Sequence, residues 1–203
     1  MRSLLFLVFN LFFYLAISRP LYASTNILFL GDSLSEGQGV DEEQSFPKLV
    51  ERNLRLKNLD IIIINGGVSG ATSASGESRL KWHLKNKVDV LVLELGANDG
   101  LRGLKINETE KNLKNIIGIA KKNKIKVLLL GLLMPPNYGK KYTKDFEKMY
   151  RHISTDEKIP LLPFLLKGVA GVPEYNQADG IHPNPKGHEL IAKSVTVFLE
   201  KNL

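Results

Sequence analysis

The sequence predicts an α/β fold, a three-layer α/β/α sandwich built around a five-stranded parallel sheet. Short apolar runs alternate with longer stretches of helical spacing five times along the chain. The apolar runs are continuous, which is typical of strands that are buried on both faces. Because a helical stretch follows each run, we expect parallel strands joined by crossovers, with helices on both faces of the sheet.

The expected strands follow the apolar runs in chain order, and the fifth run is brief. They cover residues 26–30, 60–64, 88–95, 125–133 and 159–162.

The expected helices follow the stretches in which apolar residues recur at helical spacing. Asn107 with Glu110 three residues later matches a capping box, and Asn184 before Pro185 places a cap ahead of a proline in a first helical turn. The expected helices cover residues 45–57, 75–86, 107–123, 143–157 and 185–202.

Residues 1–23 differ from the rest of the chain and resemble a secretory signal. Arg2 precedes an apolar run from Leu4 to Ile17 that is short for a membrane span, and Ala23 offers a small residue for cleavage. We expect a domain at 24–203 that works in the periplasm or as a secreted protein, with an uncleaved anchor as the alternative. The chain has no cysteine, which excludes a lipid-modified lipoprotein, disulfides and thiolate metal sites.

The net charge of +7 is a modest excess, and its distribution argues against a nucleic-acid-binding protein. The basic residues are spread over the expected helices and are not interleaved with stacking aromatic residues. A general attraction to anionic substrates or to lipid head groups is compatible with this charge, so peripheral contact with membrane lipids stays open. Nothing in the sequence demands more than a monomer.

A serine follows the first expected strand at the point where the strand ends. Gly31, Asp32 and Ser33 form a turn sequence, and a serine on such a corner can present its hydroxyl to a cleft and its backbone N–H to an oxyanion. Taken alone, the segment is as well explained by an ordinary turn. The segment from Asp179 to His182 near the other end of the chain changes this balance, because one loop there supplies a base and an orienting acid.

Two further strand-end loops carry groups that could stabilise an oxyanion. The glycines around Gly70 can turn a backbone N–H toward a ligand, and the Asn98 amide can donate a hydrogen bond without adding charge. His83, His152 and His188 are alternative bases but lie in helical patterns. Asp32 and Asp99 are alternative acids, for which we expect structural roles, whereas Glu94 on a buried strand needs a partner.

Four blocks in order, GDSLS, a glycine within NGGVSG, GAND and DGIHP, resemble those of the SGNH, or GDSL, hydrolase superfamily. Over residues 26–200 the chain is most similar to its thioesterase, lysophospholipase and arylesterase type, although Ala97 stands where that type has a glycine. The resemblance implies a flavodoxin-like fold and a serine hydrolase without metal or cofactor. It makes Ser33 the nucleophile, Asp179 and His182 the acid and base, and Gly70 and Asn98 oxyanion donors beside the Ser33 N–H.

Two loops are expected to bind the acyl part of a small ester or lipid substrate. They carry Leu101, Leu104, Pro135 and Tyr138, although ordinary packing on the domain explains these residues equally well. The expected activity is hydrolysis of lysophospholipids, aryl and fatty-acyl esters and acyl thioesters through an acyl-enzyme. A carbohydrate O-acetyl esterase of the same superfamily and a non-catalytic ligand-binding module on the same fold are the alternatives.

Overall fold

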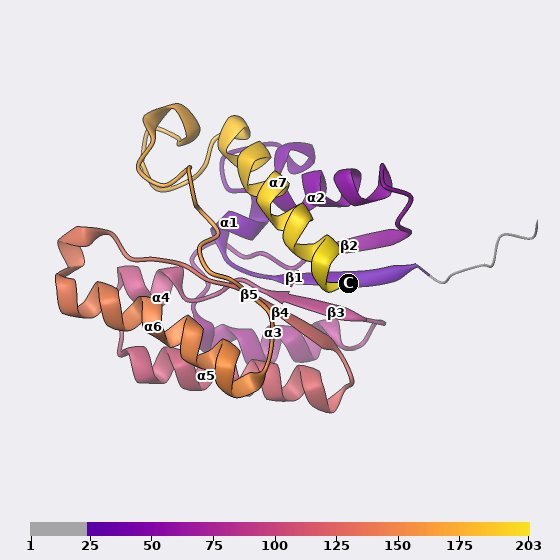
Figure 1. Cartoon of the computed structure of the whole chain (residues 1–203), viewed down its shortest axis with the longest axis horizontal. Helices are drawn as coiled ribbons and strands as arrows, with labels where there is room; N and C mark the ends of the chain where they lie inside the picture. The colour runs from indigo at the N-terminus through magenta and orange to yellow at the C-terminus, as the bar shows by residue number, and fades with distance from the viewer. Residues whose placement is uncertain (1–23) are drawn as a thin grey trace, which may run out of the picture.

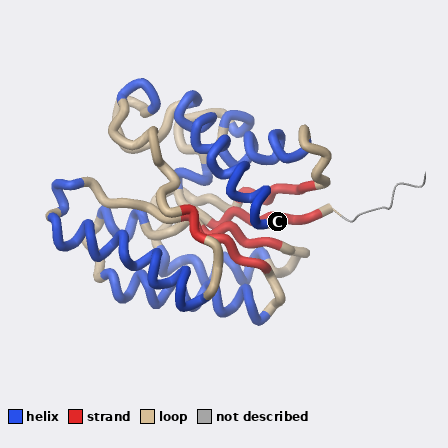
Figure 2. The backbone as a smooth tube through the Cα atoms, in the orientation of Figure 1, coloured by secondary structure: helices blue, strands red, loops and turns tan. Residues whose placement is uncertain are grey.

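The computed structural model describes residues 24–203 and has a five-stranded, all-parallel sheet between two layers of helices (Figures 1 and 2). This confirms the predicted α/β architecture, and the predicted signal at 1–23 lies outside the described residues. The spatial order of the strands is β2-β1-β3-β4-β5. Their bounds are Thr25–Leu30 for β1, Ile61–Asn65 for β2, Val90–Leu93 for β3, Lys126–Leu130 for β4 and Leu161–Leu162 for β5.

All five strands were expected to be buried on both faces. Only the strands in the middle of the sheet are buried in this way. Every residue of β3 is buried, as are the apolar residues of β4. The strands β2 and β5 are the sheet edges, and Ile62 of β2 is 40% exposed. Edge strands have a neighbour on one side only, so their flanking layers cover them less completely.

The helices divide between the two faces of the sheet. In Figure 1, α2 and α7 lie above the sheet and α3 to α6 below it, with α5 packed between α3 and α6. The longer helices are α2 at Phe46–Arg55, α3 at Gly76–His83, α5 at Ile106–Lys122, α6 at Lys140–Glu157 and α7 at Pro185–Asn202. Within residues 24–203, no helix is both long and apolar enough to cross a membrane.

Short helices occupy several strand-end and connecting segments that the sequence analysis treated as loops. Two of them, α1 and α4, follow β1 and β3 and carry predicted site residues. The short helices are α1 at Ser33–Glu36 and α4 at Ala97–Leu101, with 3-10 turns at Glu42–Gln44, Ser73–Ser75, Pro136–Tyr138 and Pro173–Tyr175.

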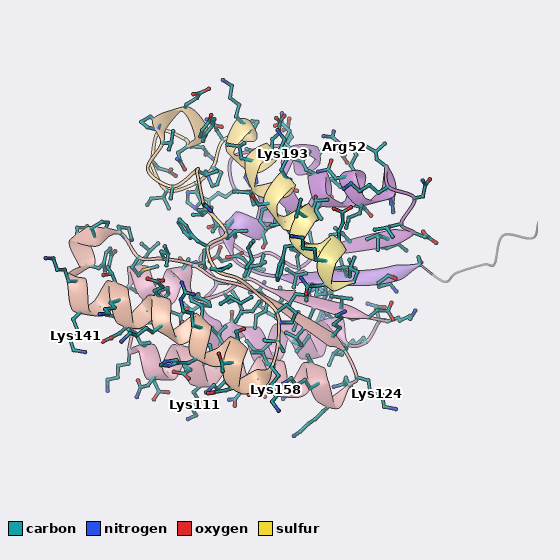
Figure 3. The ribbon with its side chains drawn as sticks, in the orientation of Figure 1. Arg52, Lys111, Lys124, Lys141, Lys158 and Lys193 are labelled. Atoms are coloured by element: carbon teal, nitrogen blue, oxygen red, sulfur yellow. The ribbon has the colours of Figure 1, made fainter. Side chains whose placement is uncertain are left out.

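Basic side chains are distributed around the molecule, as the sequence predicts. Figure 3 shows them on both helical layers and at helix ends, where they point outward. The labelled examples are Arg52, Lys111, Lys124, Lys141, Lys158 and Lys193.

One of the two predicted helix caps is wrong. Helix α5 begins at Ile106 with Lys105 as its N-cap and no side-chain cap, so Asn107 lies inside the first turn. Packing of Ile106 against the core determines this start, and tertiary burial overrides the local capping signal. The other cap is confirmed, because Asn184 Oδ1 accepts the Gly187 N–H at 3.1 Å.

The start of α7 is also fixed by a buried histidine. His188 is 1% exposed, its Nδ1 accepts the backbone N–H of Phe46 at 3.1 Å, and its ring stacks on the Phe46 ring. An imidazole that accepts through Nδ1 is neutral, and burial lowers the pKa of His188 to about 4. This contact joins α7 to α2 a few residues after the loop that carries His182.

Acidification should therefore weaken the fold through His188. The unfolded chain binds a proton near the ordinary pKa of 6.5 while the folded state resists it to about pH 4, so this stability is present above pH 6.5 and lost between 6.5 and 4. The expected loss is about 3 kcal/mol. Urea unfolding from pH 7 to 4 measures it, with His188→Asn as the comparison because its amide oxygen can accept the same N–H without titrating. Equal pH slopes for the two proteins would contradict the assignment.

Candidate active site

Ser33 is held at the first turn of α1, immediately beyond the end of β1. Asp32 is the N-cap of this helix, and its Oδ1 accepts the Leu34 N–H at 3.0 Å. Gly31 makes the sharp exit from β1 feasible, because a Cβ at this position would overlap Ser35 and Glu94. Ser33 is 8% exposed, and its hydroxyl lies at the wall of a cavity.

The structure brings Ser33, His182 and Asp179 into one hydrogen-bonded line. Ser33 Oγ lies 3.0 Å from His182 Nε2, and His182 Nδ1 lies 2.7 Å from Asp179 Oδ2. The other carboxylate oxygen of Asp179 accepts the N–H groups of Ile181 at 2.9 Å and His182 at 3.0 Å. Gly180 adopts a φ of 69°, a left-handed conformation that favours glycine and lets the loop fold back on the carboxylate.

The charge on Asp179 determines which nitrogen of His182 carries the proton. The hydrogen bond to the imidazole, and then the two backbone N–H groups, lower the pKa of Asp179 to about 2. An ionised carboxylate can only accept, so the proton of a neutral His182 sits on Nδ1. The lone pair of Nε2 is then directed at the Ser33 hydroxyl, which is the geometry a general base requires.

The predicted oxyanion donors differ in whether they already donate a hydrogen bond within the protein. Within residues 24–203, no other residue accepts the N–H of Ser33 or of Gly70, while the Gly70 carbonyl accepts from Arg102 Nη2 at 3.0 Å. Asn98 in α4 donates from Nδ2 to the Ala71 carbonyl at 3.0 Å and to Asp32 Oδ2 at 3.3 Å. The longer of these two bonds is the one that Asn98 could give up most easily to a ligand.

A cavity of about 680 Å³ opens beside Ser33 and His182. Its walls are mainly apolar, and two of the predicted substrate-binding residues, Leu101 and Pro135, line it. Four further apolar wall residues were not predicted, although apolar residues continue past the ends of the fourth and fifth strands in the sequence. These are Leu132, Met134, Phe164 and Leu166.

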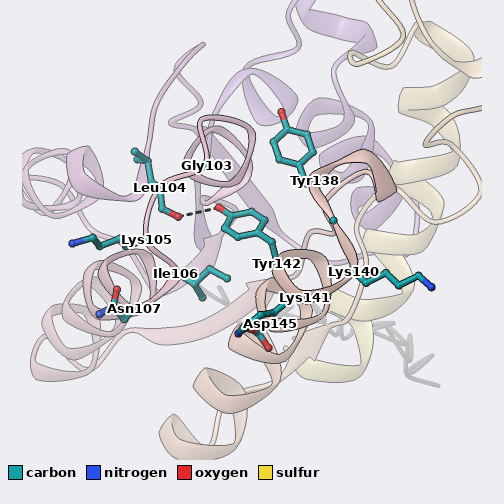
Figure 4. Close-up of a pocket in the computed structure, with 11 residues that line it drawn as sticks. Gly103, Leu104, Lys105, Ile106, Asn107, Tyr138, Lys140, Lys141, Tyr142 and Asp145 are labelled. Atoms are coloured by element: carbon teal, nitrogen blue, oxygen red, sulfur yellow. Dashed lines mark hydrogen bonds and ion pairs between the residues drawn. The ribbon is translucent and has the colours of Figure 1, made fainter.

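Leu104 and Tyr138, the other two predicted substrate-binding residues, lie in a neighbouring surface cavity that Figure 4 shows. The Tyr138 hydroxyl donates to the Leu101 carbonyl at 2.8 Å, and the Tyr142 hydroxyl donates to the Leu104 carbonyl at 2.9 Å. The turn from Leu101 to Leu104 contributes Leu101 to the cavity beside Ser33 and Leu104 to the neighbouring one. The geometry gives Tyr138 a role in holding this turn and places no side chain of Leu104 in the cavity beside Ser33.

The alternative acids and bases lie elsewhere or have structural partners. Asp99 accepts the N–H and the hydroxyl of Ser73 at 2.8 and 2.5 Å, which fixes the loop after β2. His152 is exposed on α6, and His83 is half-buried on α3. In the described part of the chain, no group of three histidine, aspartate or glutamate side chains is placed to hold a metal ion.

Comparison with known proteins shows the family of this chain. The GDSL-like Lipase/Acylhydrolase family matches residues 29–190. An arylesterase from Vibrio mimicus is 36% identical over 96% of this chain and 98% of its own. The thioesterase 1/protease 1/lysophospholipase L1 of Escherichia coli K12 is 37% identical over 84% of this chain and 81% of its own.

A solved structure shares the fold closely. The crystal structure of TesA superposes with a TM-score of 0.85 at 38% identity and covers 88% of this chain and 100% of that one. The chain belongs to the GDSL-like lipase/acylhydrolase family, the SGNH hydrolases, and is an ester hydrolase of that family.

Proposed function

We propose that Ser33 is the nucleophile, that His182 is the general base and acid, and that Asp179 orients the imidazole. The observation that carries this proposal is the continuous line from Ser33 Oγ through His182 to Asp179, with contacts of 3.0 and 2.7 Å. A serine hydroxyl is a weak nucleophile until a neighbouring base takes its proton. The same three-part arrangement serves acyl transfer in unrelated folds, which is why it is recognised by geometry.

In the first half of the reaction, Ser33 Oγ attacks the acyl carbonyl carbon while its proton passes to His182 Nε2. The tetrahedral intermediate collapses when the same proton moves to the departing alcohol or thiol, which leaves an ester on Ser33. Water then attacks this ester with His182 again as the base, and the carboxylic acid is released. Asp179 stays ionised throughout and stabilises the transient imidazolium.

The negative oxygen of the intermediate would be held by the N–H groups of Ser33 and Gly70 and by the Asn98 amide. The two N–H groups are free to donate among the described residues, which supports their assignment. Asn98 would join them by exchanging its 3.3 Å bond to Asp32 for one to the oxyanion. Donors fixed before the charge develops are worth more than donors that must be reoriented.

We propose esters and thioesters with an extended apolar acyl chain as substrates. The cavity beside Ser33 has a volume of about 680 Å³ and a mainly apolar lining, which suit such a chain, and an acetyl group would leave most of it unfilled. Relatives named arylesterase and thioesterase 1/protease 1/lysophospholipase L1 add aryl esters, acyl thioesters and lysophospholipids to the candidates. The carbohydrate O-acetyl esterase is the less favoured alternative, because it needs no such cavity.

We also propose that the protein works as a monomer outside the cytoplasm and touches lipid surfaces through the rim of this cavity. Leu133 and Ile181 line the cavity and yet are 37% and 52% exposed. Lys167 directly follows the cavity residue Leu166, and Lys140 lines the neighbouring cavity shown in Figure 4. Exposed apolar side chains at the cavity rim, with a lysine next to a cavity residue in the chain, suit contact with an anionic lipid surface.

The first test is removal of the proposed nucleophile. Ser33→Ala should lower kcat for p-nitrophenyl esters by at least about 1,000-fold, because no other group takes over the covalent step. His182→Ala should cause a loss of the same order, and the double variant little more. Ser78→Ala on α3 and His152→Ala on α6 serve as matched controls with wild-type rates. Undiminished turnover by folded Ser33→Ala would exclude Ser33 as the nucleophile.

A chain-length series tests the proposed acyl site. From acetate to octanoate, kcat/KM should rise about fourfold per methylene until the cavity is full, because each buried CH₂ contributes about 0.8 kcal/mol. Leu166→Trp should move the optimum to shorter chains by filling part of the cavity, while Val197→Trp on α7 should not. An optimum at acetate in the wild type would favour the O-acetyl esterase instead.

Vesicle sedimentation tests the proposed lipid contact. Binding should be stronger to vesicles of phosphatidylglycerol with phosphatidylcholine than to phosphatidylcholine alone. The Leu133→Ser and Ile181→Ser variants should each bind roughly tenfold more weakly, since each apolar side chain contributes about 1.5 kcal/mol or more when buried. Val197→Ser is the control, because Val197 is 48% exposed but lies on α7. Equal binding by all three variants would rule out the rim as the contact.

A further inference from the structure

A buried glutamate lies directly beneath the turn that carries Ser33. Glu94 follows β3, is 0% exposed, and takes no part in the reaction steps above. Its Oε2 accepts the backbone N–H of Asp32 at 3.1 Å and the hydroxyl of Ser35 at 2.8 Å. One carboxyl oxygen thus binds groups on both sides of Ser33 in the sequence.

The contact is tight because the carboxyl lies against the backbone of the turn. A Cβ on Gly31 would overlap both Glu94 Oε2 and the Ser35 hydroxyl, so only glycine fits between them. From the other side, Arg79 of α3 donates from Nη2 to the carbonyls of Gly31 and Gly66. The start of the turn is therefore held by two side chains: Arg79 donates to the Gly31 carbonyl, and Glu94 accepts the Asp32 N–H.

The second oxygen of this carboxyl, Oε1, has no hydrogen-bond partner among the described residues, and neither has Arg79 Nη1. Complete burial, and then the nearby Asp32 carboxyl, raise the pKa of Glu94 well above its ordinary value. Burial also raises the pKa of Asp32, to about 6. Of the two carboxyls, Glu94 is therefore the one that binds a proton more readily, and Asp32 is the one that ionises first.

No cation bonds directly to Glu94 among the described residues, because the Nη2 of the nearby Arg79 donates to backbone carbonyls. Asp32 and Ser35 face it from the turn and α1, Arg79 from α3, and Tyr150 from α6. The Tyr150 hydroxyl is fully buried and donates to the Leu95 carbonyl at 2.9 Å, so it does not neutralise a charge on Glu94. A carboxylate here would be an unsolvated charge with one oxygen unbonded, which is costly.

We propose that Glu94 is a positioning residue for the nucleophile, because its Oε2 holds Asp32 and Ser35 and thereby fixes the hydroxyl and the N–H of Ser33 relative to His182. The inference rests on the proposed function of Ser33. It assigns to Glu94 an effect on the reaction rate through geometry, with no contact to the substrate. Positioning of Ser33 requires an oxygen at the place of Glu94 Oε2 that can accept hydrogen bonds. It does not require a negative charge on Glu94.

Three substitutions separate the accepting oxygen from the charge. Glu94→Gln keeps an accepting oxygen and should retain kcat within about threefold, with an unchanged pH profile. Glu94→Met keeps the approximate shape without an acceptor, and a nucleophile displaced by about 1 Å can cost about 100-fold in kcat. Its KM should stay within about twofold, because the acyl cavity is not altered. Ser35→Ala removes one of the two bonds and should give a smaller loss in kcat.

The rate of inactivation by a fluorophosphonate gives a second readout, since this reagent reacts with the proposed nucleophile and does not depend on deacylation. It should fall in Glu94→Met by the same factor as kcat. Ser35→Ala combined with Glu94→Met should be no worse than Glu94→Met alone, because both remove the same contact.

Glu51→Met is the matched control for a buried carboxyl. Glu51 of α2 is 6% exposed, accepts the Ile63 N–H at 3.2 Å, pairs with Arg55 at 2.8 Å and does not line the cavity beside Ser33. Its loss should lower the free energy of unfolding without changing kcat or the inactivation rate. If Glu94 only stabilised the fold, Glu94→Met would likewise lower the free energy of unfolding and leave kcat and the inactivation rate unchanged.

Three results would overturn the proposal. The first is folded Glu94→Met with wild-type kcat and inactivation rate. The second is Glu94→Gln with a shifted pH profile or a loss as large as that of Glu94→Met, which would show that the charge matters. If Glu94→Met does not fold, wild-type rates in Ser35→Ala would still contradict it. Failure of the proposed function is seen separately, as esterase activity in Ser33→Ala.

Discussion

The contact between the ends of β1 and β3 is the constraint on which the candidate active site depends. Leu30 pairs with Leu93 in parallel register, so the next residues of the two strands, Gly31 and Glu94, come side by side. The missing side chain of Gly31 leaves room for the Glu94 carboxyl, which then binds the turn around Ser33. The position of the serine is thus set by strand register before any substrate arrives.

The loop that carries His182 is held by a separate set of contacts, which must place the imidazole beside Ser33. The His182 carbonyl accepts the Gln177 N–H at 2.8 Å, and Pro183 forms an isolated bridge with Asn176. Just beyond, the cap of α7 and the contact of His188 with α2 fix where the loop ends. Two separately supported elements therefore meet across one 3.0 Å hydrogen bond, and the apolar cavity lies between them. Preorganisation of this kind is what acyl transfer requires.

The strands of the sheet and the proposed nucleophile and base can be predicted from the sequence, because short segments of the chain indicate each of them. Continuous apolar runs mark the strands, and Ser33 and His182 lie in short motifs at strand-end loops. The partner of Glu94 could not be predicted, since it depends on the register of two strands about sixty residues apart. Arg79 resembles any solvated helix residue in the sequence. The cavity walls depend on how several loops pack together, which explains why the sequence does not separate Leu101, in the cavity beside Ser33, from Leu104, in the neighbouring one.

The central claim is that Ser33 is activated by its place in the line to His182 and Asp179. Mass-spectrometric mapping of the adduct left by a fluorophosphonate tests this claim most directly, because the reagent bonds covalently to an activated serine. We expect one adduct, on the peptide that contains Ser33, and none in a His182→Ala variant treated in the same way. An adduct on another residue that accompanies loss of activity, or equal labelling of Ser33 without His182, would contradict it.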